Sequence, residues 1–250
     1  SSQTGGSSSP SLSVSNMGLT VAEATQVSGA SLTQNNGSLT FKLAPSLSNS
    51  SSLSVNGGEL ILQNGGTVNG SSLQLSASVF KPTGTVSVAN GGSFTLNNTS
   101  SIVLQGDTTL NQSGTVSWPE LDLGGKKLTL GSTVSSFTVQ KALNIANGES
   151  LINLGSSDIN FASTLGIANG GKLSSGGTGT TTLQGALTLN GEIEQGGGIL
   201  KLTQGGTVGA TGKLDVGDSE LKLEAALNVS GTLAANEDSQ WSGWGHTLDL

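Results

Sequence analysis

Apolar residues stand singly along most of this chain and alternate with polar residues in short blocks. An apolar–polar–apolar block places two side chains on one face of a β-strand and one on the other. Asn-Gly, Gly-Gly and Ser-Gly pairs separate the blocks, and these residues accept the positive φ angles of tight turns. The pattern therefore predicts very short strands along nearly the whole chain. Representative blocks are residues 12–14, 53–55, 73–75, 86–88, 94–96, 121–123 and 128–130.

Three regions differ in regularity. Residues 1–10 are mostly Ser and Gly, which is typical of a flexible linker. Residues 11–50 are expected to form irregular N-terminal coils or a cap, and residues 21–27 are the best candidate for a short helix covering that end. Residues 51–250 are expected to be a regular repeat. Because the pattern stops inside a unit, we expect the repeat to continue beyond residue 250 in a longer chain.

Whole phrases recur at a nearly fixed distance. The phrase at residues 143–151 returns 22 residues later at 165–173, and a shorter copy begins another 22 residues on, at Leu187. A further copy at Leu227 lies 40 residues beyond Leu187, which is two steps. A second strand series advances at the same pitch, so both belong to one repeating unit of about 21 residues. That series comprises residues 159–161, 181–183, 200–202 and 221–223.

A unit of this length with about three short strands and no helix is typical of one coil of a parallel β-helix. Each strand would pair with its equivalents in the coils above and below, about 4.8 Å away, and about twelve coils would form a rod on the order of 55 Å long. The phrase also occurs upstream at residues 53–60 and 86–94, and the sequence around Trp118 and Leu121 is repeated around Trp244 and Leu248. The alternative, an antiparallel sandwich or barrel, would show longer strands and two-residue hairpins.

Composition agrees with a narrow aliphatic core and excludes several functions. Aromatic residues are 3% and charged residues 10%, where an ordinary domain has about 25% charged residues. Without Cys there are no disulfides or thiolate sites. A net charge of −7 with no Arg argues against nucleic-acid binding. No apolar run approaches the roughly 18 residues of a membrane span, so we expect no membrane insertion by this segment. No signal peptide opens the chain, which leaves a cytosolic protein or an excised piece of a secreted one.

The repeated phrase, together with residues 121–130, resembles the passenger domains of bacterial autotransporters and related large surface adhesins. The resemblance covers residues 53–250. It implies a right-handed parallel β-helix that is secreted and displayed at the cell surface. It also implies an outer-membrane anchor supplied by parts of the protein outside this sequence.

Catalytic patterns are hard to find. Glycoside hydrolysis needs two carboxyl groups roughly 5–10 Å apart on one face. Glu192 and Glu194 point outward from one predicted strand, and Asp215 and Asp218 flank a predicted turn, so solvated positions explain both pairs. Thr-rich residues 178–182 do not recur at the repeat distance, so an ice-binding Thr ladder is not expected. We predict no catalytic residue, no metal site and no cofactor.

The strongest local candidate for ligand binding lies near the C-terminal end. Between Leu223 and Leu250 the strand series takes 27 residues, so about six residues should leave the coil as a loop. Trp241, Trp244 and His246 lie in or beside that loop, and exposed Trp next to polar groups is suited to stacking on sugar rings. The alternative is that the Trp side chains fold over the end of the core.

The sequence therefore predicts a structural or adhesive segment of a secreted bacterial surface protein. We expect a stiff stalk that contacts a glycan or a protein on a host or neighbouring cell, and self-association through its ends. A polysaccharide-active or polysaccharide-binding β-helix, of the lyase, hydrolase or phage tail-fibre kind, remains the alternative. A purely architectural repeat without any ligand is the third possibility.

Overall fold

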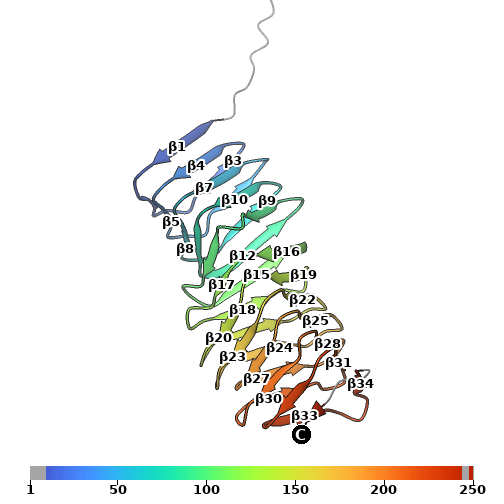
Figure 1. Cartoon of the computed structure of the whole chain (residues 1–250). Coiled ribbons are helices and arrows are strands. Elements are labelled where there is room, and N and C mark those ends of the chain that lie inside the picture. The colour runs from blue at the N-terminus through green and yellow to red at the C-terminus, as the bar shows by residue number, and fades with distance from the viewer. Residues whose placement is uncertain (1–9, 244–247, 250) are drawn as a thin grey trace, which may run out of the picture.

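The computed structural model of this protein describes residues 10–243 and 248–249. These residues form short strands joined by turns, with no helix among them, and hence none that could cross a membrane. All strand pairs are parallel and none joins consecutive strands, which is the pattern of a β-solenoid. Figure 1 shows the strands stacked like rungs from β1 at one end to β33 and β34 at the other.

The strands belong to five sheets. Sheet A contains β1 (Ser11–Ser15), β4 (Ser31–Asn35), β7 (Ser52–Asn56), β10 (Ser72–Ser76) and β13 (Ser93–Leu96). Sheet B contains β2 (Leu19–Val21), β5 (Ser38–Phe41), β8 (Glu59–Leu62), β11 (Val79–Pro82), β14 (Ser101–Val103) and β17 (Leu121–Asp122). Sheet C contains β3 (Gln26–Ser28), β6 (Ser46–Ser48), β9 (Gly66–Asn69), β12 (Gly84–Ala89), β15 (Thr108–Gln112), β18 (Lys127–Leu130), β21 (Ser150–Asn153), β24 (Lys172–Ser175), β27 (Glu192–Gln195), β30 (Lys213–Asp215) and β33 (Thr232–Ala234).

The remaining two sheets are built from the C-terminal half of the chain. Sheet D contains β16 (Gly114–Trp118), β19 (Val134–Val139), β22 (Asp158–Phe161), β25 (Thr180–Leu183), β28 (Ile199–Leu202), β31 (Glu220–Leu223) and β34 (Gln240–Ser242). Sheet E contains β20 (Leu143–Ile145), β23 (Leu165–Ile167), β26 (Leu187–Leu189), β29 (Gly206–Val208), β32 (Leu227–Val229) and β35 (Leu248–Asp249).

Each coil contributes one strand to each of three faces. The first face is sheet A followed by sheet D, and the second face is sheet B followed by sheet E. The third face is sheet C alone, which continues through 11 strands. At about 4.8 Å per coil, the stack along sheet C is roughly 50 Å long.

The predicted stacking of equivalent residues is confirmed. Leu143 pairs with Leu165, and Leu165 pairs with Leu187. The two-step jump from Leu187 to Leu227 is also correct, because Gly206 occupies the intervening coil. The second predicted series is likewise in register on sheet D, with Ile159 beside Thr181.

The upstream copies of the phrase do not occupy equivalent positions. Val86 lies on the third face and Leu53 on the first, whereas Leu143 lies on the second. The same short phrase therefore forms a strand and corner on each of the three faces. The short helix considered for residues 21–27 is also wrong, since these residues are the end of β2, a turn and the start of β3. Residues 11–50 pair in register with the coils that follow them.

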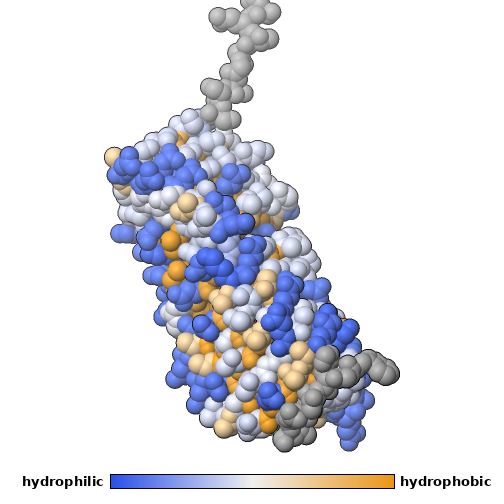
Figure 2. All heavy atoms as spheres, viewed as in Figure 1, coloured by the Kyte–Doolittle hydropathy of each residue, from blue (hydrophilic) through white to orange (hydrophobic). Residues whose placement is uncertain are grey.

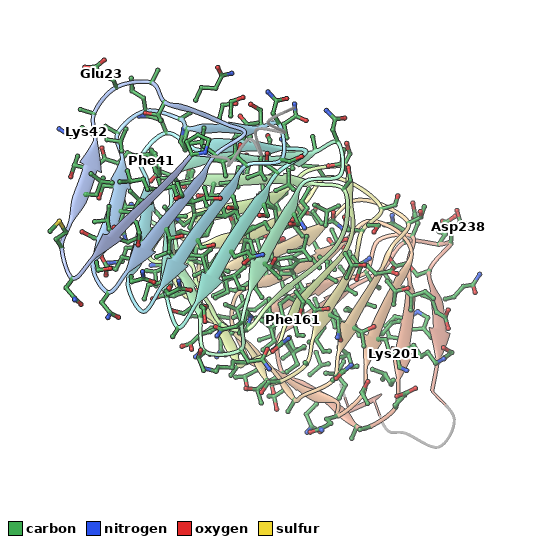
Figure 3. All side chains as sticks on the ribbon, turned by 90° about the horizontal axis from the view of Figure 1, so that it is seen from above. Glu23, Phe41, Lys42, Phe161, Lys201 and Asp238 are labelled. Carbon is green, nitrogen blue, oxygen red and sulfur yellow. The ribbon has the colours of Figure 1, made fainter. Side chains whose placement is uncertain are left out.

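The core is a set of columns, each with one aliphatic residue per coil. On the third face, Leu128, Leu151, Leu173, Ile193 and Leu214 are in register and no more than 1% exposed. Phe41 and Phe161, also almost fully buried, lie within the coils in Figure 3, while Lys201 and Asp238 lie at the outside. Because neighbouring coils bury each other's apolar residues, stability is shared along the stack.

The solenoid contains one step. β13 ends sheet A and β16 begins sheet D, and these strands are not paired. Val88 pairs with Gln112 and Ile102 pairs with Leu121, so the two coils share both points. Fourteen residues lead from Val88 to Ile102, but only nine lead from Gln112 to Leu121. The shorter path cannot follow β13, so a new sheet starts on the first face while sheet C continues.

A tryptophan fills the core beside this step. Trp118 ends β16, is 1% exposed, and packs edge-on against Phe137 with ring centroids 5.0 Å apart. Edge-to-face packing of this kind is a favourable arrangement of aromatic rings.

A column of glycines forms the corner between sheets E and C. Gly171, Gly191, Gly212 and Gly231 occupy this corner in four successive coils. A Cβ on Gly191 would lie 2.3 Å from the carbonyl oxygen of Ala168 and 2.4 Å from that of Gly171. Because these contacts are with backbone, the corner has no room for a side chain.

We expect Gly191→Ala to destabilise the protein by about 1–3 kcal/mol, the usual cost of overpacking, because its Cβ would meet two carbonyl oxygens. Gly176→Ala is the matched control, since no atom lies within 4 Å of its Cβ position. Denaturant unfolding of both variants measures the difference. Equal stability of the two variants would contradict the tight corner.

Candidate contact faces

Sheet A presents an uncharged polar ladder. None of its strands contains a charged residue, and the outward side chains are Ser, Thr, Asn and Gln in register from β1 to β13. Figure 2 shows the surface over the N-terminal coils as largely pale, the colour of Ser and Thr on this scale. The outward residues are Ser11, Ser13, Ser15, Ser31, Thr33, Asn35, Ser52, Ser54, Asn56, Ser72, Gln74, Ser76, Ser93 and Thr95.

Side chains of this ladder hydrogen bond from coil to coil. The Ser52 hydroxyl donates to Ser31 Oγ at 3.0 Å, and Asn56 Nδ2 donates to Asn35 Oδ1 at 3.0 Å. At the adjoining corner, Asn36 Nδ2 donates to Asn16 Oδ1 at 3.3 Å. These bonds hold the polar groups in fixed rows with further donor and acceptor capacity directed at solvent.

Sheet E carries a shallow hollow of about 390 Å³. It lies over Gly166, between the outward side chains of Asn144 and Thr188, with Asn190 at its edge. The residue without a side chain interrupts the outward row, which accounts for the depression. The hollow contains no charged residue, so it offers amide, hydroxyl and backbone groups alone.

Sheet C carries a ladder of ion pairs across β24, β27 and β30. Lys172 Nζ lies 2.8 Å from Glu194 Oε2 and 3.3 Å from Glu192 Oε2. Lys213 Nζ lies 3.0 Å from Glu192 Oε1 and 3.1 Å from Asp215 Oδ2. The predicted outward orientation of Glu192 and Glu194 is confirmed, and both carboxylates are engaged by lysines of neighbouring coils.

These contacts shift the pKa values of the groups involved. Hydrogen bonding from Lys213, and then from Lys172, lowers the pKa of Glu192 below its ordinary value. Hydrogen bonding from Lys213 likewise lowers the pKa of Asp215. The pKa of Lys172 is raised, chiefly by its hydrogen bond to Glu194. The shifts report mutual stabilisation of charges on a solvated face.

The other predicted acidic residue also has a partner. Asp218 Oδ1 accepts a hydrogen bond from Asn236 Nδ2 at 2.7 Å. Within residues 10–243 and 248–249, no three His, Asp or Glu side chains gather as a metal-binding group.

The loop predicted around the C-terminal tryptophans is wrong for Trp241. This residue lies on β34 and pairs in register with Leu221, only 20 residues earlier. Leu248 pairs with Leu227, so it was Leu248 that continued the series on sheet E and no extra residues are needed. Trp244 and His246, the other predicted ligand-binding residues, lie outside the described residues.

The sheet A ladder was missed by the sequence analysis, although a signal for it exists. Ser31, Ser52, Ser72 and Ser93 each precede an inward Leu or Phe and recur at the repeat distance. The search for a ladder considered only Thr. A search for any hydroxyl or amide residue at outward positions would have found it.

We expect the ion-pair ladder to stabilise the protein at neutral pH and to lose this effect in acid. Because the pKa of Glu192 is lowered in the folded state, its contribution is present above its unfolded pKa of about 4.3 and is lost as the pH falls through the folded value. Lys213→Gln should therefore lower the unfolding free energy at pH 7 more than at about pH 3. Denaturant unfolding at both values measures this difference.

Lys42→Gln is the control, because Lys42 takes part in none of the ion pairs found among the described residues. A deficit of Lys213→Gln that is as large at about pH 3 as at pH 7 would show that charge pairing is not its cause.

Comparison of the chain with protein-family models, with curated proteins and with solved structures finds no match. Its function is therefore inferred from the chemistry of its faces and ends.

Proposed function

We propose that this chain is a structural and adhesive segment of a secreted bacterial surface protein, in which a stiff solenoid carries a contact face formed by sheet A. The single observation that supports the contact role most directly is the uncharged polar ladder on that sheet. The proposal assigns no catalysis to this segment.

The stiffness follows from the way the coils are joined. Every sheet is a ladder of parallel strands, so each interior strand is hydrogen bonded to the coils on both sides. The aliphatic columns run through the same coils and exclude water from the interior. Bending such a rod would break rows of hydrogen bonds and open the packed core, which suits a stalk that holds a binding surface away from a cell.

The chemistry of sheet A suits contacts with a neutral partner. A charged group that is covered by a partner must lose its hydration, which is costly unless it is paired. Ser, Thr, Asn and Gln can instead exchange hydrogen bonds with water for hydrogen bonds with sugar hydroxyls or peptide groups. Each contact is weak, but regularly spaced rows engage a repeating or extended partner at many points, which raises the overall affinity.

The partner we propose is an uncharged glycan or a protein on a host or neighbouring cell. Surface display and an outer-membrane anchor outside this sequence follow from the resemblance to autotransporter passengers and belong to the same proposal.

The contact role is tested with a charged variant of sheet A. Ser54 and Gln74 are outward neighbours in register, so Ser54→Glu with Gln74→Glu places two carboxylates in the middle of the ladder. We expect its binding to surfaces coated with a neutral glucan or with cell-surface glycoprotein to fall by about ten-fold or more, equivalent to about 1.4 kcal/mol. Surface plasmon resonance measures the affinities.

Thr188→Glu with Thr207→Glu is the matched control, because these residues are also outward neighbours in register but lie on sheet E. It should bind as the unmodified protein does. Equal loss in both variants, or no binding by the unmodified protein, would contradict a contact role for sheet A. New reducing ends or unsaturated products on incubation with acidic polysaccharides would favour the enzymatic alternative.

A further inference from the structure

One end of the solenoid exposes an aromatic residue of the core. Trp241 stands in the inward column of sheet D, in register after Ile159, Thr181, Leu200 and Leu221. Those four residues are 0% exposed, whereas Trp241 is 46% exposed. β34 is the last strand of its sheet, so no coil among the described residues covers this side chain. Trp241 therefore projects as an apolar knob at this end.

The opposite end contains an apolar hollow. A depression of about 500 Å³ lies within the first coil, bounded by β1, β2 and β3. Leu12 at its rim is 56% exposed, and Phe41 of the next coil lies at its base. The aliphatic side chains that line it are Leu12, Leu19, Val21, Val27 and Leu32. The hollow is the continuation of the core columns and lacks the side chains that a further coil would supply.

The two ends present compatible strand edges. β1 and β34 both belong to the first face, and β3 and β33 both belong to the third. All pairs in the solenoid are parallel, so the free edge of β34 in one copy faces the same way as the edge that each strand offers to its next neighbour. A second copy placed on this end would extend the existing ladders.

These edges also lack the usual protection against pairing. Natural proteins blunt exposed strand edges with charges, especially Lys. β1, β2, β3, β33 and β34 contain no charged residue, although the interior strands of sheet C carry several. The nine residues before Pro10 contain only Ser, Gln, Thr and Gly, so they have no apolar side chain with which to fill the hollow.

We propose that copies of this chain associate head to tail, with Trp241 of one copy inserted into the hollow formed by β1, β2 and β3 of the next. Such a contact uses two different surfaces and does not close on itself, so it generates a filament. The inference goes beyond the contact role of sheet A and stands separately from it, because the lateral faces take no part.

The test uses one variant that blocks each end. Trp241→Ser removes the knob, and Leu12→Lys places a charge at the rim of the hollow. Leu154→Ser is the matched control, because Leu154 is a 66% exposed apolar residue that lies on neither end. Circular dichroism and denaturant unfolding establish that all three variants are folded.

Sedimentation equilibrium over a range of concentrations measures the assembly. The unmodified protein and Leu154→Ser should increase in mean mass with concentration, whereas Trp241→Ser and Leu12→Lys should each remain monomeric. An equimolar mixture of the two blocked variants should form a dimer and stop there, doubling the mass, because it contains one intact knob and one intact hollow.

Three results would overturn the proposal: a monomeric unmodified protein at every concentration, a mixture of folded blocked variants without dimer, or a dimer of Leu12→Lys alone. The last would show that two Trp241 ends meet each other. Loss of sheet A binding leaves these masses unchanged, so the two proposals fail by different measurements.

Discussion

Stacking each coil about 4.8 Å above the last constrains every position of this protein. An inward residue meets its own equivalent in the coils above and below, so a column is filled only if each coil supplies an apolar side chain of similar size. A corner residue meets backbone of the neighbouring coil, which leaves no space for a Cβ at Gly191. The low aromatic content and high glycine content of the chain both follow from this spacing.

The step at Trp118 shows how the solenoid tolerates a coil of different length. Two faces start new sheets there, while sheet C continues without interruption. The continuous face keeps the two halves in one stack, and the Trp118–Phe137 pair fills the core where the coil changes. Trp118 Nε1 is buried without a hydrogen-bond partner in the described part of the chain, which identifies this place as a costly part of the core.

The same stacking rule gives the lateral faces and the ends different chemistry. Lateral residues repeat along the axis, so a choice of Ser, Thr, Asn or Gln at one outward position becomes a row of hydrogen-bonding groups, as on sheet A. Lysines and carboxylates in adjacent coils become an ion-pair ladder, as on sheet C. At an end the apolar columns are interrupted, so residues of core type such as Trp241 and Leu12 become surface residues.

The sequence alone determined the repeat length, the parallel stacking and the inward positions of Leu143, Leu165 and Leu187, because alternation and displacement are local patterns that survive any arrangement of the coils. The hydroxyl and amide rows of sheet A were also encoded at the repeat distance. The assignment of residues 53–60 and 86–94 to different faces, the step at Trp118 and the place of Trp241 were decided only by the tertiary structure. The physical reason is that corners of several lengths fit the same strand pattern, and only packing of each coil against its neighbours selects the face on which a strand lies.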